Sequence, residues 1–230
     1  MTRVTTDDRT DRSPATPDQT PRGLVVDWGG VLTAAVPEAI RAWATAEGVD
    51  LEIYRLALEE WGFGPDHTGP VAALERGEMS ASDFETLLAA EFERRGATVK
   101  GAGLLSRMLA GLEVAEPRMA EVVRRAKAAG LATGLLSNSW GNSYNREGWD
   151  ELFDVVVISG EVGMRKPEPR IFDHTAALLG LPATACVMVD DLERNVEAAR
   201  AAGMTAVLHR DVDSTVAELA DLLGLDLSGV

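Results

Sequence analysis

The chain reads Gly23-Leu24-Val25-Val26-Asp27-Trp28-Gly29-Gly30-Val31-Leu32-Thr33 near its amino end. The apolar run up to Val26 predicts a short buried strand, and the two glycines after Asp27 predict a turn. A strand that stops on a carboxylate presents it at the carboxyl edge of a sheet, where open α/β sheets bind and react with ligands. Because many strands end in Asp as a turn or helix cap, this run alone leaves a structural role for Asp27 open.

Further polar groups follow, in order, at the ends of later apolar runs or directly before a helix. Ser137 and Asn138 close the run at 133–136, and Lys166 lies in the segment GMRKPEP at 163–169, just before a predicted helix. A hydroxyl and an amide can hydrogen-bond an anionic oxygen without adding charge, and an ammonium can neutralise a phosphate or a nucleophilic carboxylate. Ordinary turn chemistry and a solvated lysine are the alternatives for these residues taken singly.

Asp190 and Asp191 follow the apolar run CVMV at 186–189. Adjacent carboxylates at a buried strand end raise one another's pKa unless a cation lies between them and a third partner. Mg²⁺ fits this role, because it is a hard divalent ion that prefers oxygen ligands. An acidic turn is the alternative, which the burial expected at the base of the pair disfavours.

From Pro117 onward, predicted helices and strands alternate regularly. The expected strands are 132–136, 155–158, 185–189 and 205–208, and the expected helices are 119–129, 149–152, 169–179, 193–202 and 213–223. Such alternation indicates a parallel sheet that is covered by helices on both faces. The fold class is therefore predicted to be α/β, with a three-layer, Rossmann-like core.

A block with only helical signals interrupts this alternation after the first strand. We expect a disordered tail over residues 1–22, a core formed by 23–36 and 115–230, and an inserted all-helical cap over 37–114. Within the cap, Ser80 and Asp83 form a capping-box start, and the apolar positions Phe84, Leu87, Leu88 and Phe92 fall on one helical face. Four more residues, Trp43, Trp61, Phe63 and His67, either line a substrate pocket or pack the cap itself.

Composition limits the classes of partner. The chain has 230 residues, 46% hydrophobic and 26% charged, with a formal net charge of −15. A surface this negative repels nucleic acid and anionic membranes, so we expect neither as a partner. The single cysteine, Cys186, excludes an intramolecular disulfide and a multi-cysteine metal site. The amino-terminal segment has no apolar core of a secretory signal, so a cytoplasmic location is expected.

The ordered set Asp27, Ser137, Lys166 and Asp190-Asp191 resembles the motifs of the haloacid dehalogenase (HAD) superfamily. The resemblance covers roughly residues 23–225 and is closest to subfamily I, whose helical C1-type cap is inserted after the first strand. It implies a Mg²⁺-dependent phosphatase that hydrolyses a small phosphorylated metabolite through an aspartyl-phosphate intermediate. We expect such an enzyme to be a monomer or a homodimer.

The resemblance also implies roles for single residues. Asp27 would attack phosphorus and bind Mg²⁺, and Gly29 would offer the metal its backbone carbonyl. Asp191 would be a direct metal ligand, with Asp190 behind it. Catalytic Ser137 and Lys166, together with Asn138, would bind the transferring phosphoryl group of the substrate.

One position departs from the family pattern. Typical phosphatases of this family carry a second Asp two residues after the nucleophile as general acid and base, whereas this chain has Gly29. General acid–base catalysis typically contributes about 10²–10⁴-fold in rate. Gly29 therefore favours an alternative, a catalytically weak HAD-fold binding or regulatory protein. A haloacid dehalogenase is a further alternative, but its pattern lacks the paired acids at Asp190 and Asp191.

Overall fold

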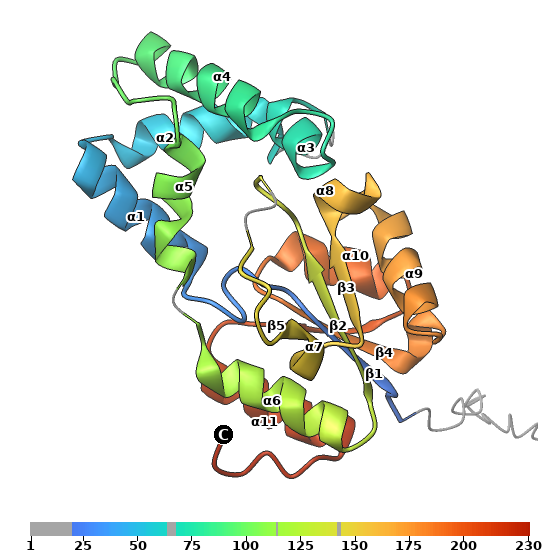
Figure 1. The fold of residues 1–230 in the computed structure, drawn as a ribbon. Helices are drawn as coiled ribbons and strands as arrows, with labels where there is room; N and C mark the ends of the chain where they lie inside the picture. Colours follow the sequence, from blue (N-terminus) through green and yellow to red (C-terminus); the bar gives the residue numbers. More distant parts are fainter. Residues whose placement is uncertain (1–19, 64–67, 114, 142–143) are drawn as a thin grey trace, which may run out of the picture.

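The computed structural model describes residues 20–63, 68–113, 115–141 and 144–230. Its centre is a five-stranded parallel sheet in the order β3-β2-β1-β4-β5 (Figure 1). The strands are β1 (Gly23–Val26), β2 (Ala132–Ser137), β3 (Val155–Ile158), β4 (Cys186–Asp190) and β5 (Thr205–Leu208). The predicted α/β fold class is thereby confirmed. Strand β1, which directly precedes Asp27, is the central strand of the sheet.

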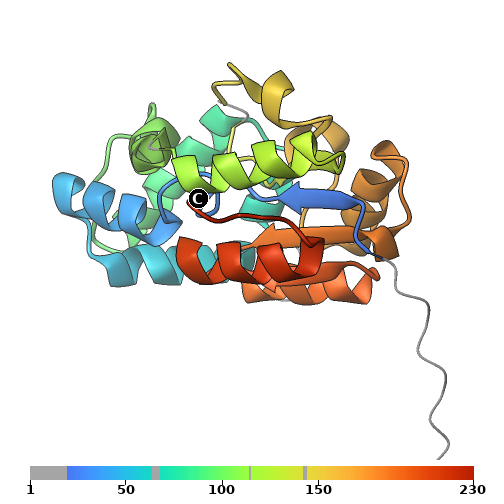
Figure 2. The same ribbon diagram turned by 90° about the horizontal axis from the view of Figure 1, so that it is seen from below.

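Helices cover both faces of the sheet. One face packs Leu24 and Val26 against α6 (Pro117–Ala128), α7 (Trp149–Leu152) and α11 (Val212–Leu223). The other packs Val25 against α9 (Pro169–Leu178) and α10 (Glu193–Ala201). Helices α6 and α11 lie next to each other, as both views show (Figures 1 and 2). Because both faces are covered, Val25 and Val26 are both fully buried, as expected for a central parallel strand.

Between β1 and α6 lies the helical insertion, which we define as the elements from α1 to η2. It comprises α1 (Val36–Glu47), α2 (Leu51–Leu58), the π-helical turn η1 (Glu59–Phe63), α3 (Pro70–Glu75), α4 (Ala81–Arg94), α5 (Leu104–Leu109) and the 3₁₀ turn η2 (Ala110–Glu113). These elements bury a hydrophobic cluster of their own, separate from the two clusters of the sheet. In Figure 1 the insertion stands beyond the carboxyl ends of the strands.

The two segments that join the insertion to the sheet run side by side. Thr33 and Ala115 form an isolated antiparallel bridge, and the N–H of Glu116 donates to the carbonyl of Leu32 at 2.8 Å. Both ends of the insertion therefore leave the core at one place.

Differences from the sequence expectation are concentrated in the insertion and the loops. Helix α4 begins at the predicted cap, where Ser80 Oγ accepts from the N–H of Asp83 at 3.1 Å. Leu87 was expected on its buried face but is 43% exposed, because the buried stripe runs through Phe84, Leu88, Glu91 and Phe92. The short helix α8 (Ser159–Val162) after β3 was not anticipated.

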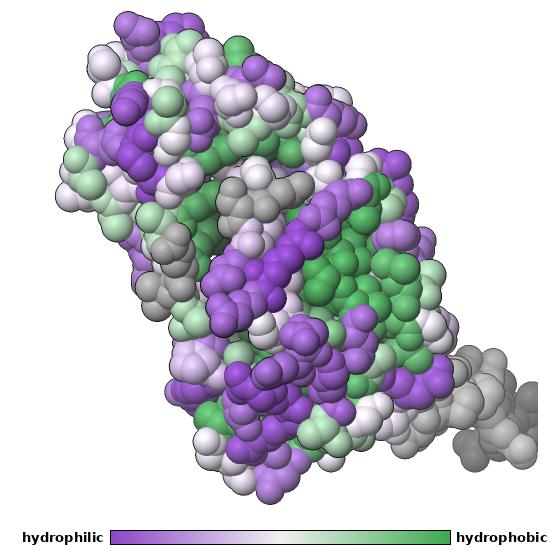
Figure 3. All heavy atoms as spheres, in the orientation of Figure 1, coloured by the Kyte–Doolittle hydropathy of each residue, from purple (hydrophilic) through white to green (hydrophobic). Residues whose placement is uncertain are grey.

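The surface in the orientation of Figure 1 mixes polar regions with a hydrophobic area over the sheet edge (Figure 3). This edge is β3, which pairs with β2 on one side, and its Val155 and Val156 are only half-buried. Among the described residues, no helix is both long and apolar enough to span a membrane.

Candidate active site

Asp27 and Lys166 meet in the buried interior at the carboxyl end of β1. The Lys166 ammonium is 1% exposed and lies 2.7 Å from Asp27 Oδ1 and 2.7 Å from Asp190 Oδ2. It also donates to the carbonyl of Leu136 at 2.9 Å. Asp27 Oδ1 in addition accepts from the N–H of Trp28 at 2.7 Å. The lysine thus joins the ends of three neighbouring strands, β1, β2 and β4.

Three carboxylates surround this lysine. Oxygen atoms of Asp27, Asp190 and Asp191 all lie within 4.8 Å of one another. Asp190 is fully buried and already accepts from protein donors on both oxygens: Oδ1 from the Leu192 N–H and Asn195 Nδ2, each at 2.9 Å, and Oδ2 from Lys166. Asp27 and Asp191 therefore have more capacity to bind an added cation than Asp190. Three carboxylates against one ammonium leave an excess of negative charge, which a divalent cation fits.

Burial and the charges of neighbouring groups shift the pKa values of Asp27, Asp191 and Lys166. Burial raises the pKa of Asp27 to about 7, and Asp190 and Asp191 push it in the same direction while Lys166 opposes them. Burial, together with Asp190, raises the pKa of Asp191 to about 6. Burial alone would lower the pKa of Lys166, but the two carboxylates beside it more than compensate and hold the pKa above its ordinary value. Paired carboxylates with raised pKa values in a buried site are typical of functional sites.

The turn after Asp27 requires glycine at only one of its two glycine positions. Gly30 has a φ of +77°, and a Cβ there would collide with the Asp191 carboxylate. A side chain at position 30 would therefore be strained and would displace a metal-ligand candidate. Gly29 has no such constraint: a Cβ would meet only Val36 Cγ2, at 3.3 Å. The absence of a side chain at Gly29 is thus not imposed by the backbone.

Ser137 and Asn138 lie at the carboxyl end of β2, beside Lys166. Asn138 Oδ1 accepts from the N–H of Lys166 at 2.8 Å, and Asn138 Nδ2 donates to the carbonyl of Lys166 at 2.9 Å. Ser137 Oγ lies 3.0 Å from Tyr144 Oη. Tyr144 was not singled out from the sequence, because it follows an irregular segment whose path could not be foreseen. The structure therefore brings the ends of β1, β2 and β4 and the Lys166 loop together at one edge.

The aromatic residues of the insertion have separate positions. Trp43 is buried and packs against Tyr54 and Phe92, and Trp61 packs against Phe84, so both contribute to the core of the insertion. The side chain of Phe63 and all of His67 lie outside the described part of the chain. Cys186 is buried in β4, as a core residue.

The insertion also supplies a residue that no motif in the sequence singled out. Glu75, the last residue of α3, is 3% exposed and reaches the loops of the core. Its carboxylate pairs with Arg165 and accepts from Asn138 Nδ2 at 3.2 Å and from Trp140 Nε1 at 3.0 Å. A buried Glu on a short helix carries no recognisable motif, so only the tertiary structure reveals these contacts.

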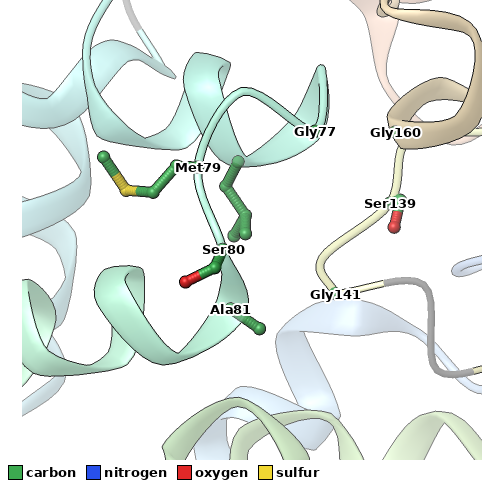
Figure 4. A pocket seen from close by; sticks show the side chains of 8 residues that line it. Gly77, Met79, Ser80, Ala81, Ser139, Gly141 and Gly160 are labelled. Carbon is green, nitrogen blue, oxygen red and sulfur yellow. The ribbon is translucent and has the colours of Figure 1, made fainter.

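A cavity of about 210 Å³ lies between the insertion and the core. Figure 4 shows Met79, Ser80 and Ala81 of the α3–α4 turn on one side and Ser139 and Gly141 of the loop after β2 on the other. No charged side chain lines this cavity among the described residues. The cavity is therefore a neutral space next to the segment that carries Ser137 and Asn138.

The fold and the site define an α/β protein with a carboxylate–lysine cluster at the carboxyl edge of its parallel sheet. A family model described as haloacid dehalogenase-like hydrolase matches residues 21–203, and the chain belongs to this family. The chain is also 28% identical over 223 residues to bifunctional epoxide hydrolase 2 of Sus scrofa, which covers 90% of the chain and 39% of that protein. The chain thus spans about two fifths of this relative.

Two further likenesses bear on the fold and the family. A sesquiterpene phosphatase of Aspergillus oryzae is 30% identical over 155 residues, which covers 65% of the chain and 77% of that protein. A HAD family enzyme of Bacteroides thetaiotaomicron, solved in complex with magnesium and inorganic phosphate, superposes with a TM-score of 0.60 at 20% identity. That alignment covers 83% of this chain and 94% of the other, and it shows the shared fold.

Proposed function

We propose that this protein is a Mg²⁺-dependent phosphomonoester hydrolase that acts on a small phosphorylated metabolite. The observation that carries the proposal is the buried cluster in which Lys166 contacts Asp27 and Asp190 while Asp191 lies within 4.8 Å. The phosphatase among the relatives and the magnesium and phosphate bound to the Bacteroides enzyme support it. Charge is the physical reason, since a phosphate dianion approaches three carboxylates only if cations offset them.

The residues of the site suit two successive displacements at phosphorus. A carboxylate oxygen of Asp27 attacks phosphorus, and the bond to the leaving oxygen breaks, giving an aspartyl-phosphate and an alcohol that takes its proton from solvent. Water then attacks the same phosphorus, loses a proton to solvent and releases inorganic phosphate with the Asp27 carboxylate restored. Lys166 and Ser137 bind the phosphoryl oxygens, and Asn138 holds the backbone of Lys166 on both sides.

Mg²⁺ would be held by Asp27 and Asp191, with the carbonyl of Gly29, while Asp190 orients Lys166. Bound there, it offsets the charge of the phosphoryl group during transfer. We further propose that residues 37–114 form a cap that excludes water from this edge of the sheet.

The test is phosphate release from a panel of phosphomonoesters with Mg²⁺ and after exhaustive chelation. We expect chelation to abolish release and readdition of Mg²⁺ to restore it. Asp27→Asn should remove turnover while leaving the fold intact, because the side chain keeps its size and loses only the attacking charge. Release that is unchanged by chelation, or that survives in the variant, would contradict the proposal.

Gly29 favours one other function, a phosphate-binding or regulatory protein with little catalytic power. Binding of Mg²⁺ and phosphate does not separate the two, because a binding protein can keep the site. Turnover of an activated aryl phosphate does separate them, and its absence in the Mg²⁺-loaded protein would favour the regulatory function.

A further inference from the structure

We propose that Glu75, a residue of the helical insertion, is a positioning residue for the catalytic lysine of the core. The proposal rests on the proposed function, in which Lys166 binds the transferring phosphoryl group. Glu75 does not contact Asp27 or Lys166 directly in the interactions that the described residues make. It acts through Asn138 and Arg165, the residue that precedes Lys166 in the chain.

The first path runs through the amide of Asn138. This amide clamps the backbone of Lys166, with Oδ1 accepting from its N–H and Nδ2 donating to its carbonyl. Glu75 Oε2 accepts a second bond from the same Nδ2, at 3.2 Å. Because a carboxylate can only accept, it favours the amide orientation with Nδ2 toward Glu75 and Oδ1 toward the N–H of Lys166. Glu75 thereby favours the one amide orientation in which Asn138 can make both hydrogen bonds to the backbone of Lys166.

The second path is the buried ion pair with Arg165. The side chains of Glu75 and Arg165 are 4% and 2% exposed, and Arg165 Nη1 is buried without a hydrogen-bond partner among the described residues. Glu75 is therefore the carboxylate that compensates the charge of Arg165. A buried charge that loses its partner is strongly unfavourable, so loss of Glu75 would drive Arg165 to a new position. Lys166, as the next residue, would move with it.

The backbone around Glu75 fixes the carboxylate in place. Ser159 Oγ donates to the carbonyl of Glu75 at 2.5 Å, and the same hydroxyl accepts from the N–H of Ser139 at 2.8 Å. Two residues on, Gly77 approaches the core so closely that a Cβ there would lie 2.5 Å from the carbonyl oxygen of Gly160. The end of α3 is thus held against helix α8 and, through Ser159, the loop after β2. This short segment ties the insertion to the catalytic edge.

The site that we propose is consequently incomplete without the insertion. The core supplies the phosphoryl-binding and metal-binding groups, and the insertion supplies the acceptor that orients Asn138. A cap that only covered the site would have no need of a buried carboxylate among the loops of the core. The contact with Asn138 indicates a second task, which is to set the position of Lys166 relative to Asp27 and Asp190.

The main test compares Glu75→Gln with a matched control in the same interface. Arg76 also pairs with a core residue, Glu168, at 3.0 Å, and the hydrogen bonds of the Asn138 side chain between described residues go to Glu75 and Lys166. We expect Glu75→Gln to lower kcat by about tenfold or more, since small misplacements of catalytic groups are costly, and to leave KM nearly unchanged. Arg76→Gln should leave both constants as in the wild type. Equal effects of the two variants would overturn the proposal.

A double-mutant cycle separates positioning from a general loss of stability. In an Asn138→Ala background the amide is absent, so Glu75→Gln should lower kcat by a clearly smaller factor than in the wild type. The same factor in both backgrounds would show that Glu75 does not act through Asn138. If Glu75→Gln does not fold, the variant that combines Glu75→Met with Arg165→Met leaves no unpaired buried charge. It should show the same fall in kcat, and wild-type kcat in this variant would also overturn the proposal.

A measurement without substrate or metal keeps this inference distinct from the proposed function. Nuclear magnetic resonance can follow solvent exchange of the Asn138 side-chain amide protons and the ammonium signal of Lys166. We expect faster amide exchange and a shifted lysine signal in Glu75→Gln, and no change in Arg76→Gln. If the wild type hydrolyses no phosphomonoester, the proposed function fails while these signals still decide whether Glu75 positions Lys166. Unchanged signals would overturn the inference even in an active enzyme.

Discussion

At the scale of single residues, Gly29 decides which substrates the proposed chemistry favours. No carboxylate follows Asp27 at the position where the family pattern has an acid, so a leaving oxygen has to depart with solvent help. A weakly basic oxygen can leave as an anion, whereas an alkoxide needs a proton during bond cleavage. We therefore expect aryl phosphates, acyl phosphates and sugar 1-phosphates to be better substrates than alkyl phosphates. The measurement is the slope of log kcat/KM against leaving-group pKa.

Gly29→Asp tests the same idea by restoring the acid. A Cβ at this position meets Val36 Cγ2 at 3.3 Å, and this methyl group has to yield by a few tenths of an ångström. We expect activity to rise more for alkyl than for aryl phosphates, which makes the slope shallower. Gly29→Ala is the matched control, because it adds the Cβ without the acid. A shallow slope in the wild type would show that another residue donates the proton.

Most of the candidate residues selected from the sequence are attached to a strand end, and Lys166, before α9, is the exception. Asp27, Ser137 and Asp190 each close an apolar run, so parallel alternation alone places them at one edge of the sheet. Glu75 and Tyr144 reach the site from a short helix and an irregular loop, where no periodicity fixes the direction of the side chain. Their roles depend on tertiary contacts, which a single sequence does not show.

At the scale of elements, α3 is the fixed point of the insertion. Its carboxyl end is held by Glu75 and by the close approach of Gly77 to Gly160, and the connecting segments pair at Thr33 and Ala115. Any closure of the insertion over the site must therefore leave these two places intact. Helix α2 and the carboxyl-terminal part of α4 lie farther from these two places (Figure 1), so we expect them to move most, because the moving part of such lids lies away from its hinges.

Hydrogen exchange tests this division of the insertion. We expect exchange over α2 and α4 to slow when Mg²⁺ and a metal-fluoride mimic of phosphate bind. The hydrogen-bonded backbone amides of Ala73, Leu74 and Glu75 in α3 should be protected already in the ligand-free protein. Helix α11, which packs under the sheet, is the internal control and should not change. If no part of residues 37–114 slowed on binding, the insertion would not act as a closing cap.

The elements were predictable in the core, where strands and helices alternate regularly, and less predictable in the insertion, where no such alternation exists. The strands β1, β3 and β5 and the short helix α7 have the bounds expected from sequence, and the other expected elements of the regular part differ by one or two residues, whereas α8 was not expected. In the insertion, the capping box located the start of α4 because its hydrogen bonds are local. The exposure of Leu87 depends on which helices pack against α4, and this depends on contacts between segments distant in the sequence.

At the scale of the whole molecule, the clustered carboxylates link metal binding to pH. The pKa of Asp27 is raised to about 7 and that of Asp191 to about 6, so both hold protons at pH 5 that Mg²⁺ must displace. We expect Mg²⁺ affinity to rise with pH up to about 7 and to level off above it. Calorimetry in buffers of different ionisation enthalpy should show proton release at pH 5 that disappears near pH 8.

In the metal-free protein, the contribution of Asp27 and Asp191 to folding stability should fall as the pH rises, whereas Mg²⁺ affinity rises. A carboxyl whose folded pKa lies above its unfolded value favours the folded state when protonated, and this contribution is lost as the pH rises between about 4 and 7. Asp27→Asn removes its share, so the wild type should lose stability relative to the variant across that range. A difference between the two proteins that is constant with pH would contradict the assigned shift of Asp27.

The central place of β1 also governs the order in which the chain can fold during synthesis. This strand is made first, but its neighbours in the sheet begin only at Ala132 and Cys186. Contacts between segments so far apart in the sequence form late, and an apolar strand without its partners is prone to aggregate. The helical insertion, by contrast, draws its hydrophobic cluster mostly from residues made before Ala110. On the ribosome we therefore expect the insertion to gain structure first. Strand β1, which precedes Asp27, can pair on both sides only after β4 has been made.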